Sequence, residues 1–353
     1  MSRMPSVVAA LGCLLTAGAA VAQPPLAPKP ADDAEYPIVL GLHQVVPDSM
    51  SVEPNMPVAH VSVIESALRW LRDNGIRTLT MDEYCEAVRR PDPPHDTILL
   101  TVDDGYETVY TQLYPLMRKY GMHLVSFVIT DHVGKRNTEN PHQPWLDWEQ
   151  CRELQQSGYV DIEAHAARGH QKIKGRVAGH VTAGPWLLTR LYDPATRVIE
   201  TQAAFEKRVR QEFMEARDTI EREVGRRPRA FCWPFGATND FALQACRAGG
   251  FEVSFTLDKK SSDPGCRRRY HLPDQQEAAF KLLERHPEHA AAAVAVESAE
   301  VNLSGTASAA VPNLDTVAAQ TLPARRAVAP IAISCAAATL IWGALYILLF
   351  RHD

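Results

Sequence analysis

The sequence has no surplus of basic residues, no closely spaced pair of cysteines and no internal repeat. Its 37 lysines and arginines are outnumbered by 42 aspartates and glutamates, which gives a formal net charge of −5. No basic patch with interleaved aromatic residues is present, so no nucleic-acid partner is expected. The composition, with 46% hydrophobic and 22% charged residues, is typical of a globular protein, and 353 residues suffice for one large domain or two ordinary ones.

Cysteines are few and irregularly spaced. Two of the seven lie in apolar terminal segments, at Cys13 and Cys335. The other five show no CxxC pattern that would indicate a metal site: Cys85, Cys151, Cys232, Cys246 and Cys266. In an oxidising compartment they allow one or two disulfides, whose pairing the sequence leaves open.

The N-terminus is typical of a secretory signal peptide. Arg3 supplies a positive charge, residues 7–22 form a short apolar run, and the Ala-Val-Ala tripeptide before Gln23 fits the small-x-small cleavage rule. A buried helix is the alternative, but the prolines of 23–35 predict an extended linker instead. We therefore expect residues 1–22 to direct export.

The C-terminus is also apolar. Residues 327–350 contain no charged side chain and exceed the ~20 residues that span a bilayer as a helix. Residues 273–326 predict a flexible linker, since much of this stretch is rich in alanine, threonine, proline and serine. We expect a terminal transmembrane helix, with a buried core helix as the alternative. Basic residues flank the segment on both sides, so its orientation stays open.

Short apolar runs alternate with amphipathic stretches over residues 36–272. The apolar runs predict strands at 37–42, 97–102, 123–129, 159–164, 230–233 and 251–257. Helical spacing predicts helices at 62–74, 107–120, 206–225 and 240–248. Strands that alternate with helices indicate an α/β fold with a mostly parallel sheet, either open or closed.

Two adjacent acids, Asp103 and Asp104, end the apolar run at 97–102. Neighbouring side chains of an extended strand point to opposite faces, so both carboxylates reach one site only if the backbone turns there. Gly105 permits such a turn. The carboxyl end of a parallel strand is where α/β folds place chemistry, although Asp-Asp-Gly alone is also an ordinary turn.

Histidines follow two other apolar runs. His165 and His170 lie where the run at 159–164 passes into a loop that contains Gly169. Their spacing puts them about 140° apart on a helix, at ~100° per residue, so a strand end and loop suit them better as a pair. With one carboxylate, two imidazoles can bind a divalent metal and leave positions for water. His43 directly follows the first run, where a solitary histidine is usually structural.

A further apolar run, residues 229–236 (RAFCWPFG), ends in proline and glycine. The N–H of Phe235 follows the proline and lies outside the strand ladder, from where it can donate to an oxyanion. Taken alone, this segment is more readily an ordinary strand and turn.

Together these motifs resemble the NodB-homology polysaccharide deacetylases of the fourth carbohydrate esterase family. Residues 101–105 (TVDDG) are similar to that family's Thr-Phe-Asp-Asp-Gly motif, and 229–235 to its Arg-x-Phe-x-x-Pro-Tyr motif. His165 and His170 are similar to its metal-binding histidines, with a wider spacing. This spacing and three further segments resemble the periplasmic poly-β-1,6-N-acetylglucosamine N-deacetylases of biofilm export systems: 41–45, 187–192 and 233–239. The resemblance covers 36–272 and implies a distorted (β/α) barrel.

The resemblance implies a metal site. Asp104, His165 and His170 would bind a divalent ion, which is zinc or else iron, cobalt or nickel. Such an ion lowers the pKa of bound water and polarises the acetamide carbonyl.

The resemblance also implies acid–base and oxyanion roles. Asp103 would be the general base that activates water, and Arg229 would orient it. The N–H of Phe235 would help to hold the oxyanion, and His43 would protonate the leaving amine.

The sequence departs from the family pattern at several positions. Ala164 and Ala166 replace the usual Ser and Thr, Glu163 stands where a small residue is common, and Phe235 replaces Tyr. We expect these changes to affect rate and metal affinity more than the fold. A linker and an apolar tail stand where Gram-negative relatives carry a glycoside-hydrolase domain.

The expected function is removal of N-acetyl groups from poly-β-1,6-N-acetylglucosamine during its export. The enzyme would be periplasmic, held at the membrane by its C-terminal helix, near an inner-membrane synthase and the export machinery. Chitin-like oligomers or peptidoglycan are alternative substrates. Weakly catalytic carbohydrate binding is an alternative function, suggested by the altered residues beside His165.

Overall fold

The computed structural model describes residues 37–51, 58–138, 140, 142–177, 180–258 and 263–272. No helix within these ranges is long and apolar enough to cross a membrane. The expected signal peptide, the linkers of 23–35 and 273–326 and the terminal helix of 327–350 lie outside the described residues. Export and membrane anchoring therefore stay predictions.

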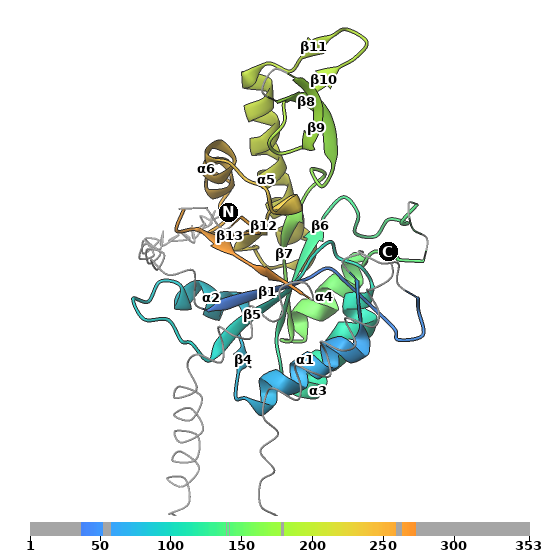
Figure 1. Cartoon of the computed structure of the whole chain (residues 1–353), viewed down its shortest axis with the longest axis vertical. Helices are drawn as coiled ribbons and strands as arrows, with labels where there is room; N and C mark the ends of the chain where they lie inside the picture. The colour runs from blue at the N-terminus through green and yellow to red at the C-terminus, as the bar shows by residue number, and fades with distance from the viewer. Residues whose placement is uncertain are drawn as a thin grey trace, which may run out of the picture. The chain divides into compact units, whose positions relative to one another are not determined.

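Nine parallel strands form the main sheet (Figure 1). Eight of them follow the order β14, β13, β12, β7, β6, β5, β1 and β15, and β4 pairs with β5 beside this path. Their bounds are β1 Ile38–Leu42, β4 Arg77–Thr78, β5 Thr97–Val102, β6 Leu124–Ile129, β7 Val160–Ala166, β12 Ala230–Cys232, β13 Val253–Thr256, β14 Cys266–Arg268 and β15 Tyr270–His271. The predicted parallel sheet is thus confirmed.

The two ends of this sheet are joined through one residue. β14 is the last strand at one end and β15 the last at the other, and only Arg269 separates them in the sequence. Since consecutive residues are ~3.8 Å apart, the two edges must come together at Arg269. The sheet is therefore curled into the distorted (β/α) barrel that the sequence resemblance implies.

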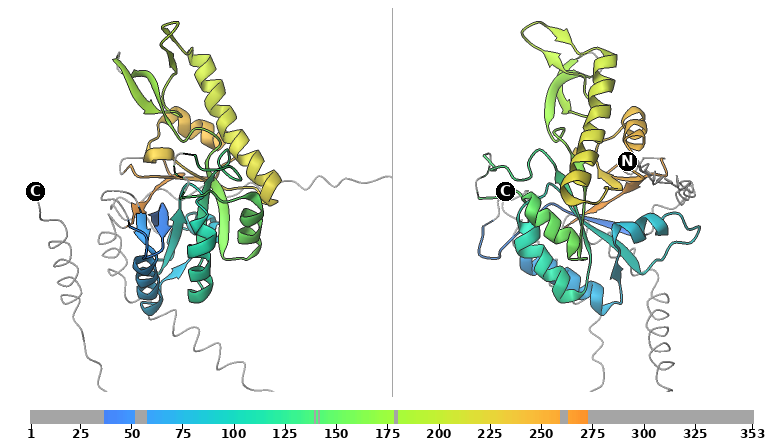
Figure 2. Two further views of the ribbon diagram at one scale, coloured as in Figure 1. Left: turned by 90° about the vertical axis from the view of Figure 1, so that its right-hand side faces the viewer. Right: turned by 180° about the vertical axis from the view of Figure 1, so that it is seen from behind.

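Helices follow most strands, and most of them cover the outside of the barrel (Figure 2). They are α1 Val61–Asp73, α2 Met81–Ala87, the π-helical turn η1 Val109–Leu113, α3 Tyr114–Tyr120, α4 Trp148–Gln156, α5 Gln202–Val224, the 3-10 turn η2 Pro234–Gly236 and α6 Asp240–Ala248. The helix predicted at 107–120 is η1 followed by α3. α2 and α4 were not predicted from the sequence, although each begins with a capping box that marks a helix start.

Buried side chains form two clusters, one on each face of the sheet. Ile98, Leu100 and Val102 pack outward under the helices. Leu99 packs inward with Tyr84 of α2, so α2 fills the interior from one end. Because side chains alternate along a strand, Thr101 and Asp103 continue the inward row that begins at Leu99.

Three small two-stranded sheets extend the fold outside the barrel. They are β2 Gln44–Val46 with β3 Val58–His60, β8 Lys172–Val177 with β9 His180–Pro185, and β10 Tyr192–Asp193 with β11 Val198–Ile199. The last two pairs stand beside α5, at the end of this helix that points away from the barrel (Figures 1 and 2). They are built from the segment between His170 and α5.

The inward face of β7 carries a buried carboxylate, Glu163. Its oxygens accept the N–H groups of Arg229 and Ala230, both at 2.7 Å, and a guanidinium N–H of Arg226 at 2.8 Å. β7 and β12 share only one register pair, so Glu163 supplies acceptors that the strand ladder lacks there. Burial raises the pKa of Glu163 to about 7, against the charge of Arg226. A glutamate at this position is therefore a structural link between two strands.

We expect Glu163→Ala to lower the free energy of unfolding by ~3–5 kcal/mol, because the change leaves two backbone donors without their acceptor and Arg226 without its closest buried partner. Glu163→Gln keeps an acceptor oxygen and should lose clearly less. Urea denaturation measures both variants. An alanine variant as stable as the parent protein would contradict this role.

Candidate active site

The backbone turns at the end of β5, as the two-carboxylate motif predicts. Asp104 and Gly105 both adopt left-handed conformations, with φ of 72° and 81°. Gly105 is needed there for a second reason, since a Cβ atom would lie 3.0 Å from Cγ1 of Val128. The turn lets the carboxylates of Asp103 and Asp104 enter the same region, and both are buried, with 1% and 8% exposure.

Asp104 meets both predicted histidines. Its Oδ1 lies 3.5 Å from Nε2 of His165 and 3.5 Å from Nε2 of His170. Within the described part of the chain, Asp104 Oδ1 and His165 Nε2 are buried and have no hydrogen-bond partner. Unpaired buried polar atoms are costly, and these face one another, so the donor set fits a divalent ion. The juxtaposition expected from the sequence is confirmed.

The ring of His165 is held in a fixed orientation. Its Nδ1 lies 2.8 Å from the carbonyl oxygen of Cys232. This contact leaves Nε2 to point toward Asp104, which is how metal-binding histidines are usually set by an outer partner.

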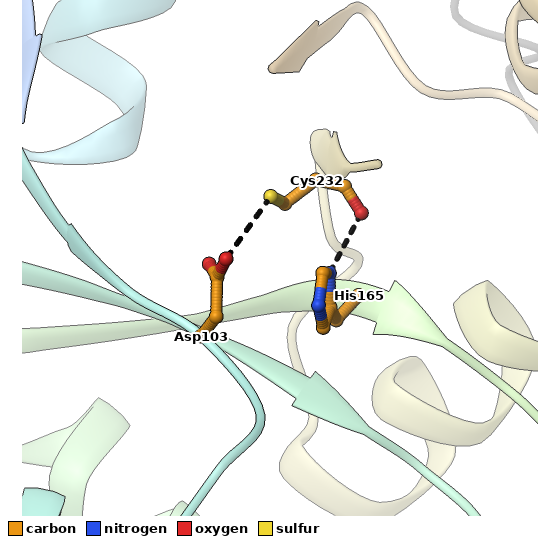
Figure 3. Close-up of side chains that lie close together, drawn as sticks. All are labelled: Asp103, His165 and Cys232. Atoms are coloured by element: carbon orange, nitrogen blue, oxygen red, sulfur yellow. Dashed lines mark hydrogen bonds between the residues drawn. The ribbon is translucent and has the colours of Figure 1, made fainter. Parts of the chain in front are cut away.

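A second group of possible ligands overlaps the first. Asp103, His165 and Cys232 face one another (Figure 3), and Cys232 Sγ lies 3.6 Å from Asp103 Oδ2. The same Oδ2 accepts a hydrogen bond from Arg269 at 2.6 Å, however. A cation bound there would lie beside a buried guanidinium, so we favour the group of Asp104, His165 and His170.

Arg269 makes the contact that the sequence analysis assigned to Arg229. Its Nη1 and Nη2 donate to the two oxygens of Asp103 at 2.7 and 2.6 Å, and both side chains are buried. Arg229 instead binds Glu252 and Asp82. It precedes β12 and lies at the amino end of that strand, whereas the candidate site lies at the carboxyl ends. The assignment of Arg229 as the group that orients Asp103 is corrected accordingly.

Burial and neighbouring charges shift the pKa values of the residues in the site. Burial alone would raise the pKa of Asp103, but Arg269 and then His165 hold it well below its usual range. Burial and the charge of Asp103 raise the pKa of Asp104 to about 7. Burial lowers the pKa of His165 to about 3 and also lowers that of His170. Both imidazoles are therefore neutral at pH 7 and can act as metal ligands.

His43 joins the site from the end of β1. Its Nε2 lies 3.6 Å from Asp103 Oδ2, and its Nδ1 lies 2.8 Å from Nε2 of His271 in β15. Burial lowers the pKa of His43 to about 4, although Asp103 acts in the opposite direction. The sequence analysis found His43 but missed His271, which follows Arg269 at the seam of the barrel.

Phe235 borders the group formed by Asp104, His165 and His170. Its φ of 60° is left-handed, and the residue is 42% exposed. The ring stacks on that of His170 with centroids 5.0 Å apart, and Lys172 Nζ lies 5.2 Å from its centroid. The sequence-predicted residues Asp103, Asp104, His165, His170, His43 and Phe235 thus form one site, from which only Arg229 is missing.

The five cysteines in the described ranges are buried, and none of the disulfides that the sequence allows is formed among them. Cys232 alone contacts the candidate site.

Comparison with known proteins gives the family. Residues 90–254 match the family model described as polysaccharide deacetylase. The chain is 29% identical over 211 residues to the poly-beta-1,6-N-acetyl-D-glucosamine N-deacetylase of Escherichia coli K12, which covers 56% of this chain and 31% of the relative. It is 24% identical over 212 residues to the enzyme of that name from Staphylococcus aureus MRSA252, covering 60% of this chain and 65% of the relative. The chain thus spans less than two thirds of the length of either relative.

Solved structures show the same fold. A de-N-acetylase from Aggregatibacter actinomycetemcomitans matches with a TM-score of 0.55 and 24% identity, covering 66% of this chain and 93% of that one. The deacetylase domain of BpsB from Bordetella bronchiseptica matches with a TM-score of 0.53 and 25% identity, covering 69% and 98%. Because the family match runs through both aspartates and both histidines, we conclude that residues 90–254 of this chain belong to the polysaccharide deacetylases, a family of hydrolases.

Proposed function

We propose that the protein hydrolyses the N-acetyl groups of poly-β-1,6-N-acetylglucosamine with the help of a divalent metal ion. The observation that carries the proposal is the convergence of Asp104, His165 and His170 beside a second carboxylate, Asp103, that is held ionised. The substrate class rests on the names of the Escherichia coli and Staphylococcus aureus relatives. Zinc is the first candidate for the ion, with iron, cobalt or nickel as alternatives.

Hydrolysis of an amide needs an activated water. An ion held by Asp104, His165 and His170 would lower the pKa of a water molecule and polarise the acetamide carbonyl. Asp103 would accept the proton of that water. Arg269 fixes both oxygens of Asp103, which leaves the base in one orientation, and it also makes Asp103 a weak base.

Departure of the amine needs a proton, and we assign its delivery to His43. His43 Nε2 lies 3.6 Å from Asp103 Oδ2, so a closer approach of the two groups during the reaction would let the proton taken from water pass to the imidazole. The lowered pKa of His43 means that it is neutral before the reaction and gives the proton up readily to an amine nitrogen. The backbone N–H of Phe235 would help to hold the oxyanion.

Aromatic rings near the site suit a sugar polymer. Tyr106, directly after Gly105, stacks on Trp145 with ring centroids 4.5 Å apart. The ring centroid of His132 lies 4.6 Å from that of Trp145. Phe235 exposes its ring beside His170. Pyranose rings present apolar faces that pack on such surfaces, which supports a carbohydrate rather than a small soluble amide as the substrate.

The test is release of free amine from an acetylated β-1,6-linked glucosamine oligomer, with chitin oligomer as the competing substrate. We expect turnover of the β-1,6-linked oligomer that a chelator abolishes and zinc restores. Asp103→Asn should reduce turnover by ~10²–10⁴-fold while keeping the metal. Binding of the oligomer without amine release, in zinc-loaded protein, would favour the carbohydrate-binding alternative, and faster release from chitin would reject the proposed substrate.

Metal affinity should depend on pH through Asp104. Its pKa of about 7 in the metal-free protein means that a proton competes with the ion as the pH falls through 7, while His165, with a pKa of about 3, stays neutral. We expect zinc affinity to fall by about tenfold per pH unit between pH 6.5 and 5. Calorimetric titration of the metal-free protein measures this, and an affinity that does not change over this range would contradict it.

Replacing Arg269 and Arg229 in turn shows which of the two arginines orients Asp103. Arg269→Ala should reduce kcat by ~10²-fold or more, and Arg269→Lys should restore only part of it, since lysine cannot bind both carboxylate oxygens. Arg229→Ala is the matched control and should keep kcat per folded molecule. An Arg229→Ala variant as slow as Arg269→Ala would restore the assignment made from the sequence.

A further inference from the structure

The loop of residues 167–169 sets the distance between the two histidine ligands. His165 lies on β7 and its ring is fixed by the Cys232 carbonyl oxygen. His170 lies beyond the loop, and its ring packs against the rings of His165 and Phe235. The position of His170 therefore depends on the loop backbone more than that of His165 does.

A buried carboxylate lies under this loop. Glu212, on α5, is 1% exposed, and its Oε1 accepts three consecutive backbone N–H groups. The donors are Ala167 at 2.8 Å, Arg168 at 2.8 Å and Gly169 at 2.6 Å. Successive N–H groups that converge on one point form a concave anion site, and here the anion is a side chain of the same protein.

The loop is shaped to fit the carboxylate. A Cβ atom at Gly169 would lie 2.8 Å from Glu212 Oε1, so only glycine lets the backbone approach this closely. The carbonyl oxygens of the same segment are also bound: Ala166 accepts from the N–H of Thr130 at 2.9 Å, and Ala167 from that of Asp131 at 3.0 Å. The backbone before His170 is thus held from both sides.

We propose that Glu212 is a positioning residue for the metal site, which fixes the loop so that His170 reaches the ion bound by Asp104 and His165. The proposal rests on the metal site of the proposed function. It accounts for a buried carboxylate in the middle of α5, more than forty positions after His165 and His170 in the sequence. α5 links the histidine loop to the β8–β11 region, so one helix supports both.

Glu215 provides a matched control. It lies on the same helix and pairs with the side chain of Arg168, but it is exposed and does not bind the loop backbone. Glu215→Ala therefore removes a contact to the same loop without removing the acceptor of the three N–H groups.

The experiment measures zinc affinity of the metal-free full chain by calorimetry, together with the free energy of unfolding. We expect Glu212→Ala to weaken zinc binding by about 10–100-fold, Glu212→Gln to weaken it less, and Glu215→Ala to leave it unchanged. In a His170→Ala background, Glu212→Ala should cause no further loss, because both changes remove the same ligand.

The outcomes separate the two proposals. If the parent protein binds no zinc, the metal site itself is wrong. If the parent binds zinc and both Glu212→Gln and Glu212→Ala bind it as tightly as the parent does, the positioning role is overturned. It is also overturned if Glu212→Ala weakens zinc binding as much in the His170→Ala background as it does in the parent protein. Should the alanine variant fail to fold, the glutamine variant, which keeps the size of the side chain, decides alone: unchanged zinc affinity rejects the role.

Discussion

The site and the closure of the barrel both depend on the buried ion pair of Arg269 and Asp103. Arg269 is the single residue between the two edge strands of the sheet, and its guanidinium binds both oxygens of the carboxylate at the end of β5. Removing one partner of such a pair costs ~3–5 kcal/mol, so the contact that orients the base also holds the seam together.

This pair determines the electrostatics of the remaining groups. Because Asp103 stays ionised, its charge adds to burial in raising the pKa of Asp104, and it opposes the burial that lowers the pKa of His43. Asp104 is therefore the carboxylate that needs a bound cation, whereas Asp103 already has one. Two adjacent aspartates in the sequence thus acquire different properties from their partners, which suit Asp103 to the proposed role of a base and Asp104 to that of a metal ligand.

Local patterns predicted the parts of the site that lie at strand ends. Asp103, Asp104 and His43 follow apolar runs, and Gly105 marks the turn that brings both carboxylates inward. Arg269 and His271 lie on short strands whose position depends on closure of the whole sheet, and no local pattern distinguishes Arg269 from Arg267 and Arg268 beside it. Arg229 was assigned from a family motif, but it lies at the wrong end of β12. Glu212 sits in a helix rich in charge, where a buried glutamate is not distinguishable from its exposed neighbours.

The most direct test of this account is a crystal structure of the zinc-soaked protein with the ion located by anomalous scattering. The account predicts one ion bound by Asp104, His165 and His170, with Arg269 still paired to both oxygens of Asp103. An ion bound instead by Asp103 and Cys232, with Arg269 displaced, would contradict it.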